Sequence, residues 1–222
     1  MKTAKSILTI VILLFIANTA LAQGFGVRAG VNLQNLNGKD FEGDKLENDL
    51  SMGFNVGVNY EVLVGTDIYF QPGLLFSTKG AKSTETVLAQ ELESKIALSY
   101  IELPLNIVFK PLLGTGHMLL GFGPYVGYGV GGKYTLDTPS TSTEWDIEFQ
   151  NEVTDSDIDK DAFFIKPFDA GANFIIGYEM ANMLSIQLNA QLGLIDINPK
   201  YPVDDEATLK NTGFGLSLGY RF

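Results

Sequence analysis

The stretch TGFGLSLGYRF at residues 212–222 alternates strictly between large apolar residues and small or polar ones. The apolar positions are Phe214, Leu216, Leu218, Tyr220 and Phe222, and the positions between them are Gly213, Gly215, Ser217, Gly219 and Arg221. A two-residue period places successive side chains on opposite faces of a β-strand. The stretch therefore predicts a strand with one apolar face and one face of small or polar side chains.

The same alternation recurs in seven earlier segments, whose apolar rows run through residues 25–33, 52–62, 68–76, 101–109, 118–130, 168–180 and 184–194. Most rows are near the about 9 to 11 residues that a tilted strand needs to cross a bilayer. Inside a membrane every backbone polar group has to be paired, so such a sheet has to close on itself. We predict an all-β protein, an eight-stranded antiparallel up-and-down transmembrane β-barrel.

The connections between these segments are alternately long and short. Long gaps fall at 35–51, 77–95, 132–165 and 195–211, and they hold 21 of the 26 acidic residues. Outer-membrane barrels have short periplasmic turns and long extracellular loops. The gaps therefore predict four acidic outer loops. A soluble barrel is the alternative, but a weaker face rich in glycine, as at 121–129, suits a narrow lumen better than a solvated exterior.

The N-terminal residues resemble a secretory signal. Lys2 and Lys5 precede an apolar run, and Ala20-Leu21-Ala22 stands before Gln23, so we expect cleavage between Ala22 and Gln23. We therefore divide the chain into a signal peptide, 1–22, and an outer-membrane barrel domain, 23–222. The formal net charge is −11, and −13 once the two signal lysines are removed, which argues against nucleic-acid binding.

Four stretches of the chain resemble the PorT-type family of small, porin-like outer-membrane barrels. They are GVRAGVNLQNL at 26–36, SYIELPLNIVFK at 99–110, GPYVGY at 123–128 and the closing GFGLSLGYRF at 213–222. The resemblance implies an outer-membrane location in a Gram-negative bacterium and, for some family members, a part in protein secretion. It supplies no catalytic residues.

Charged residues on the weaker face are the first candidate site, because an ionisable group in a narrow lumen needs a partner. Arg28, Glu61, Glu179 and Arg221 all fall near the periplasmic ends of their strands, so we expect one ion-pair cluster there. Glu102, near mid-depth, belongs to the same set of lumen charges but has no evident partner in the sequence. We interpret the set as a structural network, with ion or proton passage as the alternative.

Spaced carboxylates in the third long gap are a weak candidate for cation binding. Asp155, Asp157, Asp159 and Asp161 recur at every second position. A calcium loop uses such oxygens, but it also needs a turn glycine and a closing glutamate, and Lys160 and Lys166 occupy those places. Solvated acidity is the preferred interpretation, and we predict no metal site and no cofactor.

An enzyme is not indicated, because His117 is the only histidine, there is no cysteine, and His117 falls at the periplasmic end. We expect contacts with membrane lipids and the outer-membrane glycolipid, and with the barrel-assembly machinery through the strand that ends at Phe222. The sequence favours an interaction protein that presents acidic loops to a surface or secretion partner. A narrow channel for small solutes or ions is the alternative, and a lipid-acting enzyme is a second one.

Overall fold

The computed structural model describes residues 24–87, 90–157, 160, 162–202 and 206–222. The expected signal peptide and its cleavage point at Ala22 and Gln23 lie outside the described residues. No helix in the described part of the chain is long and apolar enough to cross a membrane.

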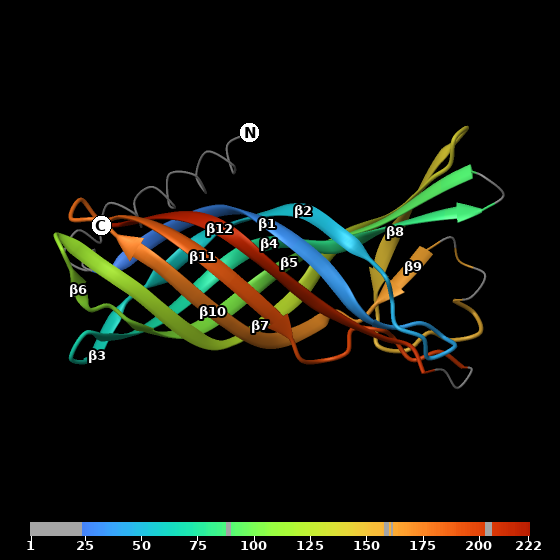
Figure 1. Cartoon of the computed structure of the whole chain (residues 1–222). Helices are drawn as coiled ribbons and strands as arrows, with labels where there is room; N and C mark the ends of the chain where they lie inside the picture. Colours follow the sequence, from blue (N-terminus) through green and yellow to red (C-terminus); the bar gives the residue numbers. More distant parts are fainter. Residues whose placement is uncertain (1–23, 88–89, 158–159, 161, 203–205) are drawn as a thin grey trace, which may run out of the picture.

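The described residues form twelve strand segments (Figure 1). Their bounds are β1 Phe25–Lys39, β2 Asp49–Tyr60, β3 Val62–Gly65, β4 Ile68–Val87, β5 Gln90–Phe109, β6 Leu112–Leu113, β7 Gly116–Asp137, β8 Ser142–Phe149, β9 Ala162–Ile165, β10 Phe168–Glu179, β11 Leu184–Gly193 and β12 Thr208–Arg221.

Eight of these strands form a closed antiparallel ring in the order β1, β2, β4, β5, β7, β10, β11 and β12, and β12 pairs with β1. The ring confirms the predicted eight-stranded barrel. The short strands β3 and β6 only extend the hairpins at the periplasmic end. Closure leaves the ring without a free edge, which a membrane requires.

The apolar rows cover the outer surface of the barrel. Met52, Phe122 and Leu188 are 75%, 62% and 58% exposed, whereas the polar side chains Asn55, Asn173 and Gln187 on the opposite face are buried. Large apolar side chains on the outside and buried polar ones inside are the arrangement of a lipid-facing barrel.

Short turns join the strands at one end, where Asp67 and Met183 adopt left-handed backbone conformations with φ of 57° and 66°.

The outer connections contain more strand than the sequence indicated. The gap expected at 77–95 is a hairpin, because β4 and β5 each run for 20 residues, about twice the length that crosses a bilayer. The gap at 132–165 contains the end of β7, then β8, then β9, which pairs with β8 in parallel. Outside the bilayer a strand does not need an apolar lipid face, so these extensions carry no apolar row that the sequence could reveal.

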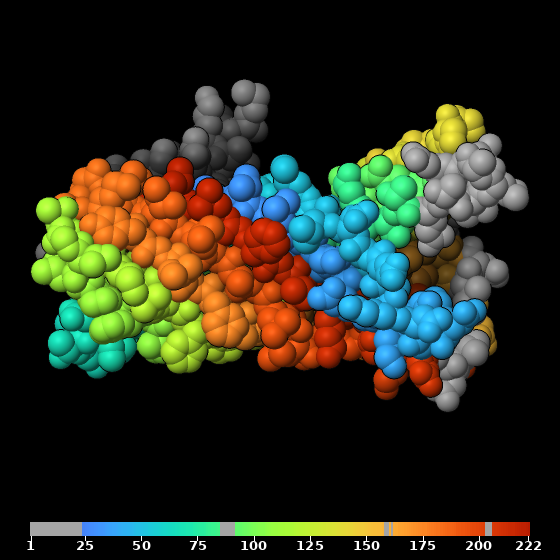
Figure 2. Space-filling view, in the orientation of Figure 1, coloured from blue at the N-terminus to red at the C-terminus, as the bar shows by residue number. Residues whose placement is uncertain are grey.

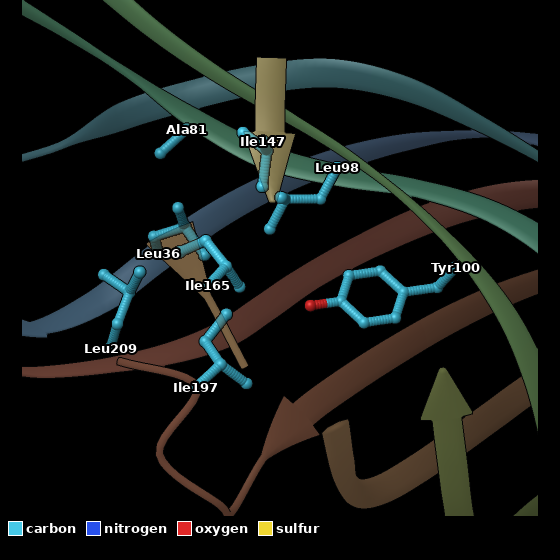
Figure 3. Packing of buried hydrophobic residues seen from close by; sticks show 8 residues of the cluster. All are labelled: Leu36, Ala81, Leu98, Tyr100, Ile147, Ile165, Ile197 and Leu209. Atoms are coloured by element: carbon cyan, nitrogen blue, oxygen red, sulfur yellow. The ribbon is translucent and has the colours of Figure 1, made fainter. Parts of the chain in front are cut away.

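A hydrophobic cluster closes the outer mouth of the barrel (Figure 3). Ile147 of β8 and Ile165 of β9 lie among side chains of the barrel wall, of which Leu36, Leu98 and Tyr100 are at most 1% exposed. Gly129 of β7 makes room for the loop that carries them, because a Cβ atom there would overlap the ring of Phe149. The connection between β7 and β10 therefore folds back onto the barrel.

Candidate functional site

The lumen between this cap and the periplasmic end is filled by polar and charged side chains. It contains a lower ion-pair cluster, a small cavity and an upper ion-pair cluster. Above the cap lie the acidic outer loops.

The lower cluster consists of Lys110, Glu61, Glu179 and Arg221. Lys110 Nζ lies 2.8 Å from a Glu61 oxygen and 2.9 Å from a Glu179 oxygen, and these three side chains are at most 6% exposed. Arg221 donates to Glu179 at 2.6 Å and lies 3.6 Å from Glu61. Two cations thus face two carboxylates, so the cluster carries no net charge.

The structure brings together three residues of the expected periplasmic cluster and adds Lys110. Sequence reasoning missed Lys110 because it follows the last apolar position of β5, although it continues the inward row of that strand. Arg28 is not in this cluster. It pairs with Gly219 in the β1–β12 ladder, two residues further into the barrel than Arg221, and its side chain donates to Asn189.

The upper cluster is centred on Lys79, which lies 2.6 Å from Glu102 and 2.9 Å from Asp169. The side chains of all three are at most 1% exposed. Tyr125 and Asn211 donate hydrogen bonds to Asp169 at 3.1 and 2.9 Å. Glu102, for which the sequence suggested no partner, is thus held by Lys79 and also accepts a hydrogen bond from Gln191 at 2.9 Å.

Between the clusters lies a cavity of about 30 Å³, whose lining includes Arg28, Asn32, Glu102 and Asn106. Since one water needs about 10 to 15 Å³ of such space, the cavity holds about two waters. Buried Nε of Arg28 and Oδ1 of Asn106 have no hydrogen-bond partner among the described residues, so they are the groups such waters would satisfy. This cavity is therefore too small to hold a solute larger than a few waters.

The ionised lumen side chains balance in both clusters. Arg28 is positioned to add a positive charge near Glu102, so that the upper half also has two cations against Glu102 and Asp169. Buried charges are tolerated only when they are paired and hydrogen-bonded. The described lumen therefore offers no unbalanced charge that would attract an ion.

The acidic outer surface surrounds the cap. Its exposed carboxylates in the described residues are Glu42, Asp44, Glu47, Asp49, Asp137, Glu144, Asp146, Glu148, Glu152, Asp155 and Glu206. The loops beneath these side chains are ordered by hydrogen bonds. Lys166 N–H donates to Ile197 at 2.8 Å, and Asp196 accepts from the backbone N–H of Leu209 at 2.7 Å.

The aspartates considered for cation binding are only partly described, since Asp159 and Asp161 lie outside the described residues. Asp157 accepts from Lys160 Nζ at 2.6 Å and from the Thr154 N–H at 3.0 Å, and these contacts lower the pKa of its carboxyl. Asp155 is exposed. Within the described residues, no group of three or more His, Cys, Asp or Glu side chains is arranged to hold a metal ion.

His117, the residue on which an enzymatic reading depended, starts the inward row of β7 and pairs with Glu179 in the β7–β10 ladder. It lies at the periplasmic end, next to the lower cluster rather than the outer rim.

The comparison with protein families identifies the architecture independently: the profile described as "Outer membrane protein beta-barrel domain" matches residues 19–198. The chain belongs to this family. It is therefore an integral outer-membrane β-barrel, as the closed ring and its apolar exterior also require. The match does not extend to the PorT-type group, so that finer assignment stays a prediction.

Comparison with solved structures finds small barrels of similar extent. The crystal structure of Neisserial surface protein A is 8% identical with a TM-score of 0.46, covering 90% of this chain and 97% of that one. The crystal structure of Ail, the attachment invasion locus protein of Yersinia pestis, is 15% identical with a TM-score of 0.41, covering 90% and 99%. No curated protein matches the chain.

Proposed function

We propose that this barrel is a membrane-embedded platform that presents its acidic outer loops to a protein partner outside the cell, and that it is neither a channel nor an enzyme. The observation that carries the proposal is the double closure of the lumen. Ion pairs fill one end and an apolar cluster fills the other.

The order of the outer loops supports the same function. A loop that only links two strands does not need a buried core of its own, since connecting segments normally run over the surface. Here Ile147, Ile165 and Ile197 are at most 7% exposed, and neighbouring carboxylates such as Glu148 and Glu152 point to solvent, with 51% and 70% exposed side chains. A fixed arrangement of like charges favours a partner with a basic surface, because complementary charge speeds encounter and selects among partners.

The resemblance to PorT-type barrels suggests a component of a protein-secretion system as one such partner, and a surface protein is the other. Crosslinking in intact outer membranes tests the platform directly. The variant carries Glu148→Gln, Glu152→Gln and Asp155→Asn, which neutralise exposed carboxylates and leave the buried isoleucines in place.

We expect the neutralised variant to lose crosslinked species that the native protein forms. Asp67→Asn is the matched control, because it removes a carboxylate from a periplasmic turn and asparagine tolerates the left-handed backbone there. An unchanged crosslinking pattern in the loop variant would contradict the proposal. Stable single-channel openings of the purified barrel in a planar bilayer would favour the channel instead.

Lipid hydrolysis by the purified barrel tests the enzymatic alternative. We expect no activity above background, and activity lost in His117→Ala would contradict this part of the proposal.

A further inference from the structure

The barrel wall is interrupted between β2 and β4, near the outer end. The ladder pairs Leu50 with Ala81 and resumes at Asn55 with Ser77, so four residues of β2 face three of β4. In the interval the Thr78 hydroxyl, rather than a backbone carbonyl, accepts the Phe54 N–H at 2.8 Å. A β-bulge of this kind bends the strand and disrupts the pairing locally. We call this interruption the lateral gap.

A cavity of about 230 Å³ occupies the lateral gap. Its lining residues are Gln34, Ser51, Met52, Gly53, Phe54, Thr78, Lys79, Lys95 and Ala97. In Figure 2 the outline of the molecule is notched between the blue and cyan surface of β1 and β2 and the green surface of β4 and β5. Met52, Phe54 and Ala97 of its lining are exposed side chains of the outward rows, so the cavity opens on the outer surface of the barrel, unlike the small cavity in the lumen.

The lining combines hydroxyl and amide groups with two lysines and contains no carboxylate. Lys79 is already neutralised by Glu102 and Asp169 in the upper cluster. Lys95 forms no ion pair within the described part of the chain. The charge that the lateral gap offers to a ligand is therefore that of Lys95.

The strand register places the Lys95 charge beside another lysine, so an anion at Lys95 would be stabilising. Lys82 stands directly opposite Lys95 in the β4–β5 ladder, and like charges in that position destabilise a sheet. Lys82 forms an ion pair with Glu93 at 2.9 Å, and Lys133 on the next strand, β7, forms an ion pair with Glu144. Of these three lysines at the outer rim, only Lys95 has no carboxylate partner among the described side chains, and it is the one that lines the lateral gap.

The lateral gap also lies where an anionic headgroup would be. Met52 and Phe54, 75% and 49% exposed, belong to the apolar outer face of β2, and Lys95 lies beyond the last large apolar residue of the outward row of β5, Ile101. An amphiphile in the outer leaflet could place acyl chains against the apolar face and its headgroup beside Lys95.

We propose that the lateral gap binds a phosphorylated glycolipid of the outer leaflet, with its phosphate at Lys95 and its sugar hydroxyls at Ser51 and Thr78. The several hydroxyl and amide groups of the lining fit a sugar phosphate better than a simple phospholipid phosphodiester, which offers fewer hydroxyl groups. This inference concerns the barrel wall and stands independently of the loop-presenting function.

The test uses the mature barrel in a neutral detergent, titrated with a diphosphorylated lipid A and followed by native mass spectrometry. Lys95→Gln should weaken binding about fivefold, the factor that one basic residue contributes near an anionic lipid surface. Ala97→Phe should weaken it as well, because the larger ring fills the lateral gap while all charges remain. Lys210→Gln is the matched control, since Lys210 is a half-exposed lysine near the outer end of β12, two strands from β2.

Two further ligands decide what the site recognises. Removing the phosphates from lipid A should weaken binding to the native barrel at least as much as Lys95→Gln weakens binding of diphosphorylated lipid A. Phosphatidylglycerol should not displace diphosphorylated lipid A at equal concentration. Equal losses in Lys95→Gln and Lys210→Gln would overturn the proposed site, and displacement by phosphatidylglycerol would overturn the choice of a glycolipid. Retained heat-modifiable migration in detergent gels shows that each variant is folded.

Discussion

Removing Lys110 should destabilise the barrel more than removing any exposed lysine. Lys110 Nζ lies within 3.1 Å of both Glu61 oxygens and 2.9 Å from Glu179, and its side chain is 2% exposed. In Lys110→Met only Arg221 would remain to neutralise two carboxylates that are 5% and 6% exposed.

The magnitude follows from what is left behind. A pair of unit charges 4 Å apart interacts by about 4 kcal/mol at an effective dielectric constant of about 20, and Lys110 makes two such contacts. Part of this is offset because the lysine no longer has to be desolvated. Breaking a buried ion pair by removing one partner costs about 3 to 5 kcal/mol, and we expect a loss in this range.

Reversible urea unfolding in lipid vesicles, followed by circular dichroism, measures the change in the free energy of unfolding. Lys200→Met is the control, because that side chain is 76% exposed and lies 3.8 Å from Glu152, a surface pair worth less than about 1 kcal/mol. The double variant Lys110→Met with Glu61→Gln restores one cation to one carboxylate. It should therefore be more stable than Lys110→Met alone by about 1 to 3 kcal/mol. A loss below about 1 kcal/mol in Lys110→Met, or a double variant less stable than the single one, would refute the reasoning.

Three further predictions address the outer loops and the lumen. Gly129→Leu should displace Phe149, because the ring of Phe149 occupies the space of the added side chain. Limited proteolysis should then cut within β8 or β9 faster than in the native protein. Equal cleavage rates would contradict the packing of the cap. Lys160 and Thr154 hold the pKa of the Asp157 carboxyl below its ordinary value. The ionised carboxylate therefore stabilises this turn fully above the unfolded-state pKa. That stabilisation is lost only as the pH falls through the lower folded-state pKa. The Thr154 amide resonance should accordingly stay unchanged at a pH where exposed aspartates titrate, and a shift at about pH 4, an ordinary aspartate pKa, would count against the contact. Planar-bilayer recordings of the native barrel should show no stable openings, because both ends of the lumen are filled.

The apolar rows made the ring predictable, whereas the lumen charges were only partly so. The outward residues of every strand contact the same lipid, so the apolar pattern repeats along the chain and can be recognised in one sequence. Ion pairs in the lumen join different parts of the barrel wall, and their two members have no fixed separation in the sequence. Asp169 lies in the first inward position of β10 and Lys79 in the inward row of β4, yet nothing in the sequence links them across 90 positions.

The bounds of the expected gaps explain two of the omissions. Lys79 falls in the expected gap at 77–95 because the apolar row of β4 ends at Phe76, and Lys110 directly follows the apolar row of β5, which ends at Phe109. Both lysines continue the inward row of their strand after the outward row has left the apolar band. Extending each inward row by one or two positions would have placed both cations in the lumen.

The alternation that builds the wall also separates two tasks in the outer loops. In β8, Ile147 is buried in the cap, while its neighbours Asp146 and Glu148 point to solvent. Because successive strand residues face opposite sides, the acidic face can change without altering the seal. Substitutions at Asp146 and Glu148 should therefore change the charge of the outer surface at little cost in stability, whereas a polar residue at Ile147 would expose the upper ion pairs to water. One short strand can thus close the barrel with one face and carry exposed carboxylates on the other.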